Sequence, residues 1–176
     1  SQPSSLSITI ANNSNISCHS LCDGFIDGDT VDLSNLHRQH LYQPGDIGKK
    51  KVRVAKRSLE NISSQTKIIA FDNFLNQSNA KSCFENIDII IDATDNIASR
   101  QIIDKVSKDK NIPMVYGSLY RFEGQVGVFN TESKIGYTEL FPGNISGGKT
   151  CEEAGVIGML PSIIGNMQAL EVIKLI

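Results

Sequence analysis

The sequence predicts a single α/β domain with a mostly parallel sheet flanked by helices, and three observations support this prediction. Helical and strand-like segments alternate along most of the 176 residues, an order that right-handed crossovers convert into a parallel sheet. Residues 88–92 form an apolar run with acidic ends, which is typical of a strand covered on both faces. Apolar residues recur every three or four positions within residues 46–62, which indicates an amphipathic helix. We therefore expect a Rossmann-like fold, with antiparallel strands toward the C-terminal half.

The individual elements follow from local patterns of apolar residues, unbroken or alternating for strands and of period three to four for helices. The expected strands are residues 6–10, 25–26, 67–71, 88–92, 113–116 and 125–129. The expected helices are residues 46–62, 79–86, 96–110 and 154–176. Within the last of these, Pro161 marks either a break or the first turn of the final helix. Residues 130–150 show little periodicity, and a loop of this length is often functional.

Composition and charge exclude several classes of function. A hydrophobic content of 40% and a charged content of 20% are ordinary for a folded domain. A formal net charge of −2 gives no reason to expect a nucleic-acid partner. No apolar run approaches the roughly 20 residues that a membrane helix needs, and no signal-peptide pattern follows Ser1. We therefore expect neither a nucleic acid nor a membrane as a partner.

The cysteines are scattered along the chain, at Cys18, Cys22, Cys83 and Cys151. A disulfide framework usually shows dense and regular cysteines in a short secreted chain, so this pattern favours a reducing cytoplasm. The pair Cys18 and Cys22 could form half of a zinc site, but no second close pair completes it. The three histidines, His19, His37 and His40, show no spacing typical of metal ligands.

Three polar residues in the first third of the chain are candidates for nucleotide chemistry. Asp27 closes a short apolar stretch, where an acid often binds ribose hydroxyls, although it could equally be a turn aspartate. Arg38 could bind phosphate through two parallel hydrogen bonds or remain a solvated charge in a loop. Lys51 follows Gly48 near a predicted helix start, where its ammonium could reach phosphates or belong to a hydrated helix surface.

Two further candidates come later in the chain. Asp95 stands between a predicted strand and a predicted helix, so it could bind Mg²⁺ together with phosphate oxygens or cap the helix. Cys151 lies where the long loop meets the last helical segment. A helix N-terminus there would favour the nucleophilic thiolate, whereas Glu152 and Glu153 would oppose it. The alternative is an inert small residue.

These candidates belong to a set of motifs that occur in one order at regular spacings. The motifs are residues 27–39 (DGDTVDLSNLHRQ), Gly48-x-x-Lys51, residues 92–96 (DATDN), Glu123-Gly124-Gln125, residues 151–156 (CEEAGV) and residues 168–174 (QALEVIK). This set closely resembles the ThiF/MoeB/HesA family of adenylyltransferases, which are relatives of the ubiquitin-activating enzymes. The resemblance covers about three-quarters of the chain.

The resemblance implies ATP-dependent adenylation of the C-terminal glycine carboxylate of a ubiquitin-like sulfur-carrier protein (ThiS/MoaD-like), with release of pyrophosphate. It leaves the pathway open between thiamine and molybdopterin biosynthesis, among others, and it implies a homodimer. Residues 130–150 would be a crossover loop that passes over the tail of the carrier protein. The implied roles are ribose binding by Asp27, phosphate binding by Arg38 and Lys51, a Mg²⁺ ligand in Asp95, nucleotide-pocket positions at Asp29, Asn35 and Gln39, and a possible covalent link to the carrier at Cys151.

The sequence departs from the family pattern in two places. The family has a Gly-rich phosphate loop after its first strand, whereas here no glycine follows residues 6–10 until Gly24. The N-terminal part is therefore atypical or incomplete. Relatives that bind zinc carry a CxxC where this chain has Tyr137-Thr138-Glu139-Leu140, so we expect no zinc.

Two other functions compete with adenylation. A family member without the Gly-rich loop could bind a partner or the carrier protein without turning over ATP. An NAD-dependent enzyme would fit the alternation of elements, but it requires the glycine fingerprint that is missing and gives no role to Arg38 and Lys51.

Overall fold

The computed structural model describes residues 9–12, 22–62, 66–142 and 155–176. In this part of the chain, one sheet of six strands has the order β3-β2-β1-β4-β5-β6. Strands β2 and β3 pair in parallel, as do β4 and β5, whereas β6 runs antiparallel to β5. The strands are β1 (Thr9–Asn12), β2 (Cys22–Ile26), β3 (Lys67–Phe71), β4 (Ile89–Asp92), β5 (Met114–Tyr120) and β6 (Glu123–Phe129).

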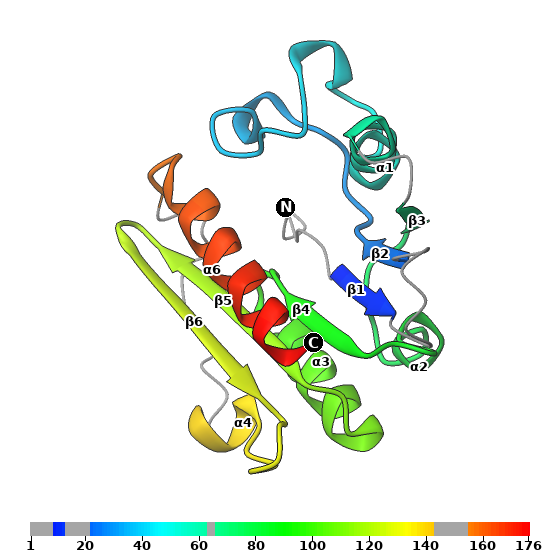
Figure 1. Ribbon diagram of the computed structural model, residues 1–176. Helices are drawn as coiled ribbons and strands as arrows, with labels where there is room; N and C mark the ends of the chain where they lie inside the picture. The colour runs from blue at the N-terminus through cyan, green and yellow to red at the C-terminus, as the bar shows by residue number, and fades with distance from the viewer. Residues whose placement is uncertain (1–8, 13–21, 63–65, 143–154) are drawn as a thin grey trace.

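Helices cover both faces of this sheet (Figure 1). Helix α6 crosses the front of β5 and β6, and α3 lies behind the sheet. The helices are α1 (Lys51–Ile62), α2 (Ala80–Cys83), α3 (Ile97–Lys110), α4 (Tyr137–Leu140) and α6 (Leu160–Leu175), with short 3-10 helices at Leu33–Asn35 and Pro44–Asp46. The predicted α/β fold with antiparallel pairing toward the C-terminal half is therefore confirmed.

Local sequence signals place several element boundaries correctly. The strand predicted at residues 67–71 is β3. Helix α3 begins directly after Asn96, whose side chain accepts a hydrogen bond from the Ser99 backbone N–H at 2.7 Å and so acts as the N-cap. The alternative interpretation of Asp95 as the helix cap is therefore wrong. Pro161 lies in the first turn of α6, where its missing N–H removes no helical hydrogen bond.

Two expectations about the N-terminal half differ from the structure. The helix predicted over residues 46–62 begins only at Lys51, because Gly48 has a φ of +83° and interrupts the helical path. Strand β1 runs antiparallel to both of its neighbours, β2 and β4. Only residues 13–21 connect β1 to β2, and a parallel crossover needs a dozen or more residues. A short connection between adjacent strands therefore favours the antiparallel pair.

The described hydrophobic core has two parts. The larger part lies between the sheet and helices α2, α3 and α4, and Phe84, Ile90, Ile103 and Met114 are fully buried in it. A smaller cluster of Val31, Tyr42, Val54 and Ala55 packs the segment between β2 and α1 onto α1. This smaller cluster is what positions the polar residues of the segment between residues 27 and 51. Along the described residues, no helix combines the length and the apolar character that crossing a membrane would require.

Candidate nucleotide site

The candidate site lies beyond the carboxyl ends of β2 and β4. Asp27 directly follows β2, and Asp95 lies three residues beyond the end of β4. These two strands point the same way because both run antiparallel to β1, which lies between them. Residues that follow them therefore reach the same edge of the sheet, which is where ligands bind in open α/β sheets.

Asp27 is a buried carboxylate with one oxygen unused. Its side chain is 1% exposed, and Oδ1 accepts a hydrogen bond from the Asp29 backbone N–H at 2.8 Å. Oδ2 is buried without a hydrogen-bond partner among the described residues. Burial raises the pKa of Asp27 to about 7, with Lys51 opposing this rise and Asp29 and Asp95 adding to it. An unpartnered oxygen of this kind suits a ligand hydroxyl, because a buried acceptor without a donor is costly.

Lys51 places a cation beside the carboxylate of Asp29, two residues after Asp27. Its side chain is 1% exposed, and Nζ lies 3.2 Å from Asp29 Oδ2. The backbone N–H of Lys51 also donates to the Asp29 carbonyl at 3.0 Å, so the start of α1 is tied to the turn after β2. The interpretation of Lys51 as part of a hydrated helix surface is therefore wrong. Because Lys51 and Asp95 both act on the pKa of Asp27, these charges form one cluster with Asp29.

The polar segment after β2 is a compact turn that its own side chains stabilise. Asp32 caps the first 3-10 helix by accepting from the Ser34 backbone N–H at 2.8 Å. Asn35 is buried, and its Oδ1 accepts from the Asp32 backbone N–H at 3.2 Å. Arg38 Nη1 donates to the Ser34 carbonyl at 2.7 Å. Gln39 has a buried Oε1 that lacks a hydrogen-bond partner among the described residues.

A cavity of about 900 Å³ lies beside this turn. Residues 38–42 form one side of it, residues 93–97 and strand β5 form the floor, and α6 forms the opposite side. Among the residues predicted for the site, Arg38, Gln39 and Asp95 line this cavity. Its size is within the range of small-molecule sites, about 300–1,000 Å³.

The other described residues that were predicted for the site are not among those that line this cavity. Tyr42, which lines the cavity, has its pKa raised by burial and further by Asp27 and Asp29, so these two carboxylates lie close to it. Asn35 and Lys51 are buried as well. Cys151 and residues 143–150 of the expected crossover loop lie outside the described residues. Near the start of that loop, residues 137–140 form α4, and the expectation of no zinc stays a prediction.

The main residue that the sequence analysis missed is Arg100, which lines the cavity from α3. Its Nε donates to Asp92 Oδ2 at 2.8 Å, and its Nη2 donates to the carbonyls of Thr94 at 2.6 Å and Gly117 at 3.2 Å. Arg100 therefore joins the end of β4 to β5 next to Asp95. The sequence did contain one indication of this burial. Arg100 stands three residues before Ile103, which was expected to face inward, and residues three apart lie on the same face of a helix.

Gln168 on α6 strengthens the same junction. Its Nε2 donates to the carbonyls of Asp92 at 2.9 Å and Val115 at 3.2 Å. A Cβ on Gly117 would lie 2.5 Å from Gln168 Cδ, so only glycine at this position lets the amide approach the sheet. The motif at residues 168–174 thus begins with Gln168, whose side chain bridges β4 and β5.

Aromatic rings form the wall of the cavity beyond β5. Tyr116 contacts Tyr137 and Phe141, with ring centroids 5.3 and 6.3 Å apart. The guanidinium of Arg100 lies 4.6 Å from the centroid of the Tyr116 ring, within the range of a cation–π contact. The cavity therefore has a charged end beside Asp95 and an aromatic end beside α4.

No group of three or more His, Cys, Asp or Glu side chains that could hold a metal is found in the described ranges. Mg²⁺ usually takes only one or two carboxylates and completes its shell with water and phosphate oxygens, and Asp95 could supply such a carboxylate. Asp27 Oδ2 is buried without a partner among the described residues, and the Lys51 ammonium pairs with Asp29.

The chain is similar in sequence to several known proteins. A sequence model of the ThiF family matches residues 24–176. The chain is 41% identical over 157 residues to a probable molybdopterin-synthase adenylyltransferase of Porphyra purpurea, which covers 87% of this chain and 41% of the relative. It is 34% identical over 160 residues to a sulfur carrier protein adenylyltransferase of Thermus thermophilus, which covers 87% of this chain and 59% of that relative.

Solved structures share the fold. A crystal structure of E. coli MccB with MccA-N7isoASN superposes with a TM-score of 0.74 at 19% identity, over 86% of this chain and 48% of that one. A structure of MccB with ATP gives a TM-score of 0.69 at 20% identity, over 86% of this chain and 47% of that one. The chain thus spans about two-fifths to three-fifths of the length of these relatives.

Proposed function

This chain belongs to the ThiF family, and on that premise we propose that it contributes the nucleotide-binding part of an adenylyltransferase. The substrate is the C-terminal carboxylate of a ubiquitin-like sulfur-carrier protein, which reacts with ATP to give an acyl-adenylate and pyrophosphate. Two kinds of support carry the proposal. The relatives from Porphyra and Thermus are named as adenylyltransferases, and a buried charge cluster lies beside a cavity large enough for a nucleotide.

The single observation that carries the proposal most directly is the pair Asp27 and Lys51. Both side chains are 1% exposed, and Asp27 retains an unpartnered oxygen. Burial of charges that serve only stability is costly, and such groups commonly mark functional sites. The interpretation as a partner-binding module without ATP turnover gives no role to this oxygen.

In the proposed reaction the substrate carboxylate is itself the nucleophile, so no general base is required. One carboxylate oxygen bonds to the α-phosphorus of ATP, the bond from that phosphorus to the bridging oxygen breaks, and pyrophosphate leaves. Negative charge develops on the phosphate oxygens during this exchange. Lys51 and Arg38 offer cationic donors for that charge, and Asp95 offers a carboxylate for Mg²⁺, which neutralises phosphate charge when bound. The protein's contribution is thus positioning and electrostatic stabilisation.

Release of pyrophosphate tests this proposal. We expect the full chain to release pyrophosphate from ATP only when Mg²⁺ and a ThiS/MoaD-like carrier with an intact C-terminal glycine are both present. A carrier whose terminal glycine is deleted is the matched control. Binding of the carrier without any release of pyrophosphate would support the alternative, a binding module, and contradict the proposed activity. The cytoplasmic location stays a prediction that rests on the scattered cysteines.

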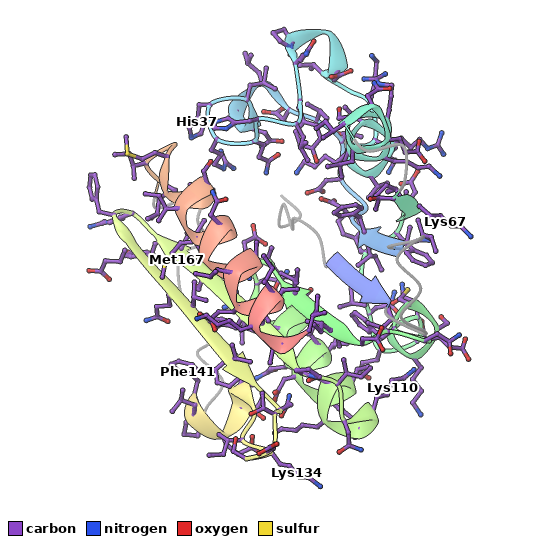
Figure 2. All side chains as sticks on the ribbon, in the orientation of Figure 1. His37, Lys67, Lys110, Lys134, Phe141 and Met167 are labelled. Atoms are coloured by element: carbon purple, nitrogen blue, oxygen red, sulfur yellow. The ribbon has the colours of Figure 1, made fainter. Side chains whose placement is uncertain are left out.

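We further propose that the partner set includes a second copy of this chain, which packs against the outer face of α6. Four apolar side chains are exposed there, at spacings of three to four residues: Ile163, Met167, Leu170 and Ile173. Met167 is labelled on α6 in Figure 2. A two-fold axis across α6 would pair this face with itself.

Replacing Met167 by glutamate tests the dimer. We expect the variant to raise the dimer dissociation constant by at least about tenfold, because it places two like charges in an apolar contact. Light scattering across a dilution series measures this constant. The control is Gln77→Glu, which adds the same charge at an exposed position away from α6. A wild-type monomer, or equal constants for both variants, would show that α6 is not the interface.

A further inference from the structure

Asp104 on α3 is a buried carboxylate outside the nucleotide site. Its side chain is 1% exposed, and both of its oxygens accept hydrogen bonds. Oδ1 accepts from the Tyr137 backbone N–H at 2.8 Å and from Asn130 Nδ2 at 3.1 Å. Oδ2 accepts from the backbone N–H of Thr138 at 3.1 Å and from its hydroxyl at 2.6 Å. Asp104 therefore holds the first residues of α4 by both backbone and side chain.

These donors require the ionised form of Asp104. An ionised carboxylate only accepts hydrogen bonds, and every partner here is a donor. Burial acts to raise the pKa of Asp104, but the hydrogen bonds from Thr138, Tyr137 and Asn130 outweigh it and lower that pKa. Lys108 lies 3.4 Å from Oδ2 and also contacts Glu139 at the end of α4. The anchor is thus a charged network between α3 and α4.

The backbone before α4 is shaped to reach this carboxylate. A Cβ on Gly136 would lie 2.5 Å from Asp104 Oδ1, so a side chain at this position would push α4 away. The Gly136 backbone N–H donates to Glu139 at 2.7 Å. Because α4 has only four residues, it is too short to be stable alone, and its position depends on these contacts.

Helix α4 and the residue that follows it provide the aromatic end of the cavity. Tyr137 and Phe141 both line the cavity, with ring centroids 4.9 Å apart. Figure 2 labels Phe141 beside α4. The strand order puts Asp27 after β2, Asp95 after β4 and Tyr116 on β5, with α4 beyond β6 (Figure 1). Two strands, β1 and β4, therefore lie between β2, which Asp27 follows, and β5, which carries Tyr116 of the aromatic wall.

We propose that Asp104 is a positioning residue for the acyl substrate: it holds α4 so that Tyr137 and Phe141 form the wall against which the carboxylate-bearing tail lies. This inference rests on the proposed adenylation. It assigns Asp104 no contact with either substrate. The effect of changing Asp104 should therefore fall on the Michaelis constant for the carrier protein and not on that for ATP.

The test compares Asp104→Asn with Asp109→Asn in the full chain. Both variants neutralise one carboxylate on α3, but Asp109 is half exposed and pairs only with Lys105 among the contacts described. In Asp104→Asn, an –NH₂ group replaces one accepting oxygen and faces the N–H and hydroxyl donors of Tyr137 and Thr138, so hydrogen bonds to α4 are lost. We expect the KM for the carrier to rise about tenfold in Asp104→Asn, as for the loss of a buried charged hydrogen bond, with the KM for ATP changed less than twofold. Asp109→Asn should match the wild type.

Thr138→Val provides a second variant that keeps the carboxylate and removes only its shortest donor. It should shift the carrier KM in the same direction by a smaller factor. An equal rise in both Michaelis constants, or a lowered melting temperature with both constants unchanged, would overturn the inference and leave Asp104 a purely structural residue. A wild-type chain that releases no pyrophosphate would instead overturn the proposed function itself, and with it this role.

Discussion

Replacing Lys51 by methionine is expected to lower kcat for carrier-dependent pyrophosphate release by about 100- to 1,000-fold, the usual effect of removing one preorganised charge-stabilising donor. Methionine keeps most of the volume of the lysine stem and removes the ammonium. That ammonium lies 3.2 Å from Asp29 and influences Asp27, in a position that water hardly reaches. Its attraction for a phosphate oxygen is therefore much less screened than that of a surface lysine.

The control for this variant lies on the same helix. Lys56 is 42% exposed and pairs with Glu60 at 3.6 Å, so Lys56→Met makes the same chemical change where it should have little effect. A coupled pyrophosphate assay measures kcat, and thermal unfolding shows whether each variant is folded. If Lys51→Met retained activity within threefold of Lys56→Met, Lys51 would have no part in stabilising phosphate charge.

The elements of this fold that sequence predicts well are those with strong local signals. Residues 67–71 form an apolar run between Lys67 and Asp72, and residues 96–110 carry the apolar periodicity of a helix. They appear as β3 and α3 with nearly the expected bounds. The direction of β1 was not predictable in the same way. It depends on how short the connection to β2 is, and an apolar run in the sequence carries no direction.

The candidate site likewise contains residues that local motifs indicate and residues whose role depends on distant contacts. Asp27, Arg38, Lys51 and Asp95 could be proposed from the sequence because they belong to motifs close to strand and helix ends. The residues that organise the cavity wall, Arg100 and Gln168, act through contacts with backbone carbonyls of Asp92, Thr94, Val115 and Gly117. Such partners are separated by up to 76 positions, and no local pattern in the sequence specifies them.

The pair Arg100 and Asp92 also carries the largest expected effect on stability. Arg100→Leu is expected to lower the free energy of unfolding by about 3–5 kcal/mol, because it leaves a buried carboxylate without its cation. Asp92 has a side chain that is 0% exposed, and Arg100 Nε lies 2.8 Å from its Oδ2. Although burial acts to lower the pKa of Arg100, Asp92 and Tyr116 raise it overall, so the guanidinium stays charged at any pH at which the protein folds.

Urea unfolding of the wild type and of two variants measures this effect. Arg53→Leu is the matched control, since Arg53 is 76% exposed and pairs with Asp72 at 3.3 Å, and exposed pairs contribute only about 0–1 kcal/mol. Removing both charges, with Asp92→Leu added to Arg100→Leu, should recover part of the loss, because no unpaired charge then remains buried. The loss should not be fully recovered, since Arg100 also donates to the carbonyls of Thr94 and Gly117. Equal unfolding free energies for Arg100→Leu and Arg53→Leu would mean that water reaches Asp92, and the junction between β4 and β5 would then not depend on this ion pair.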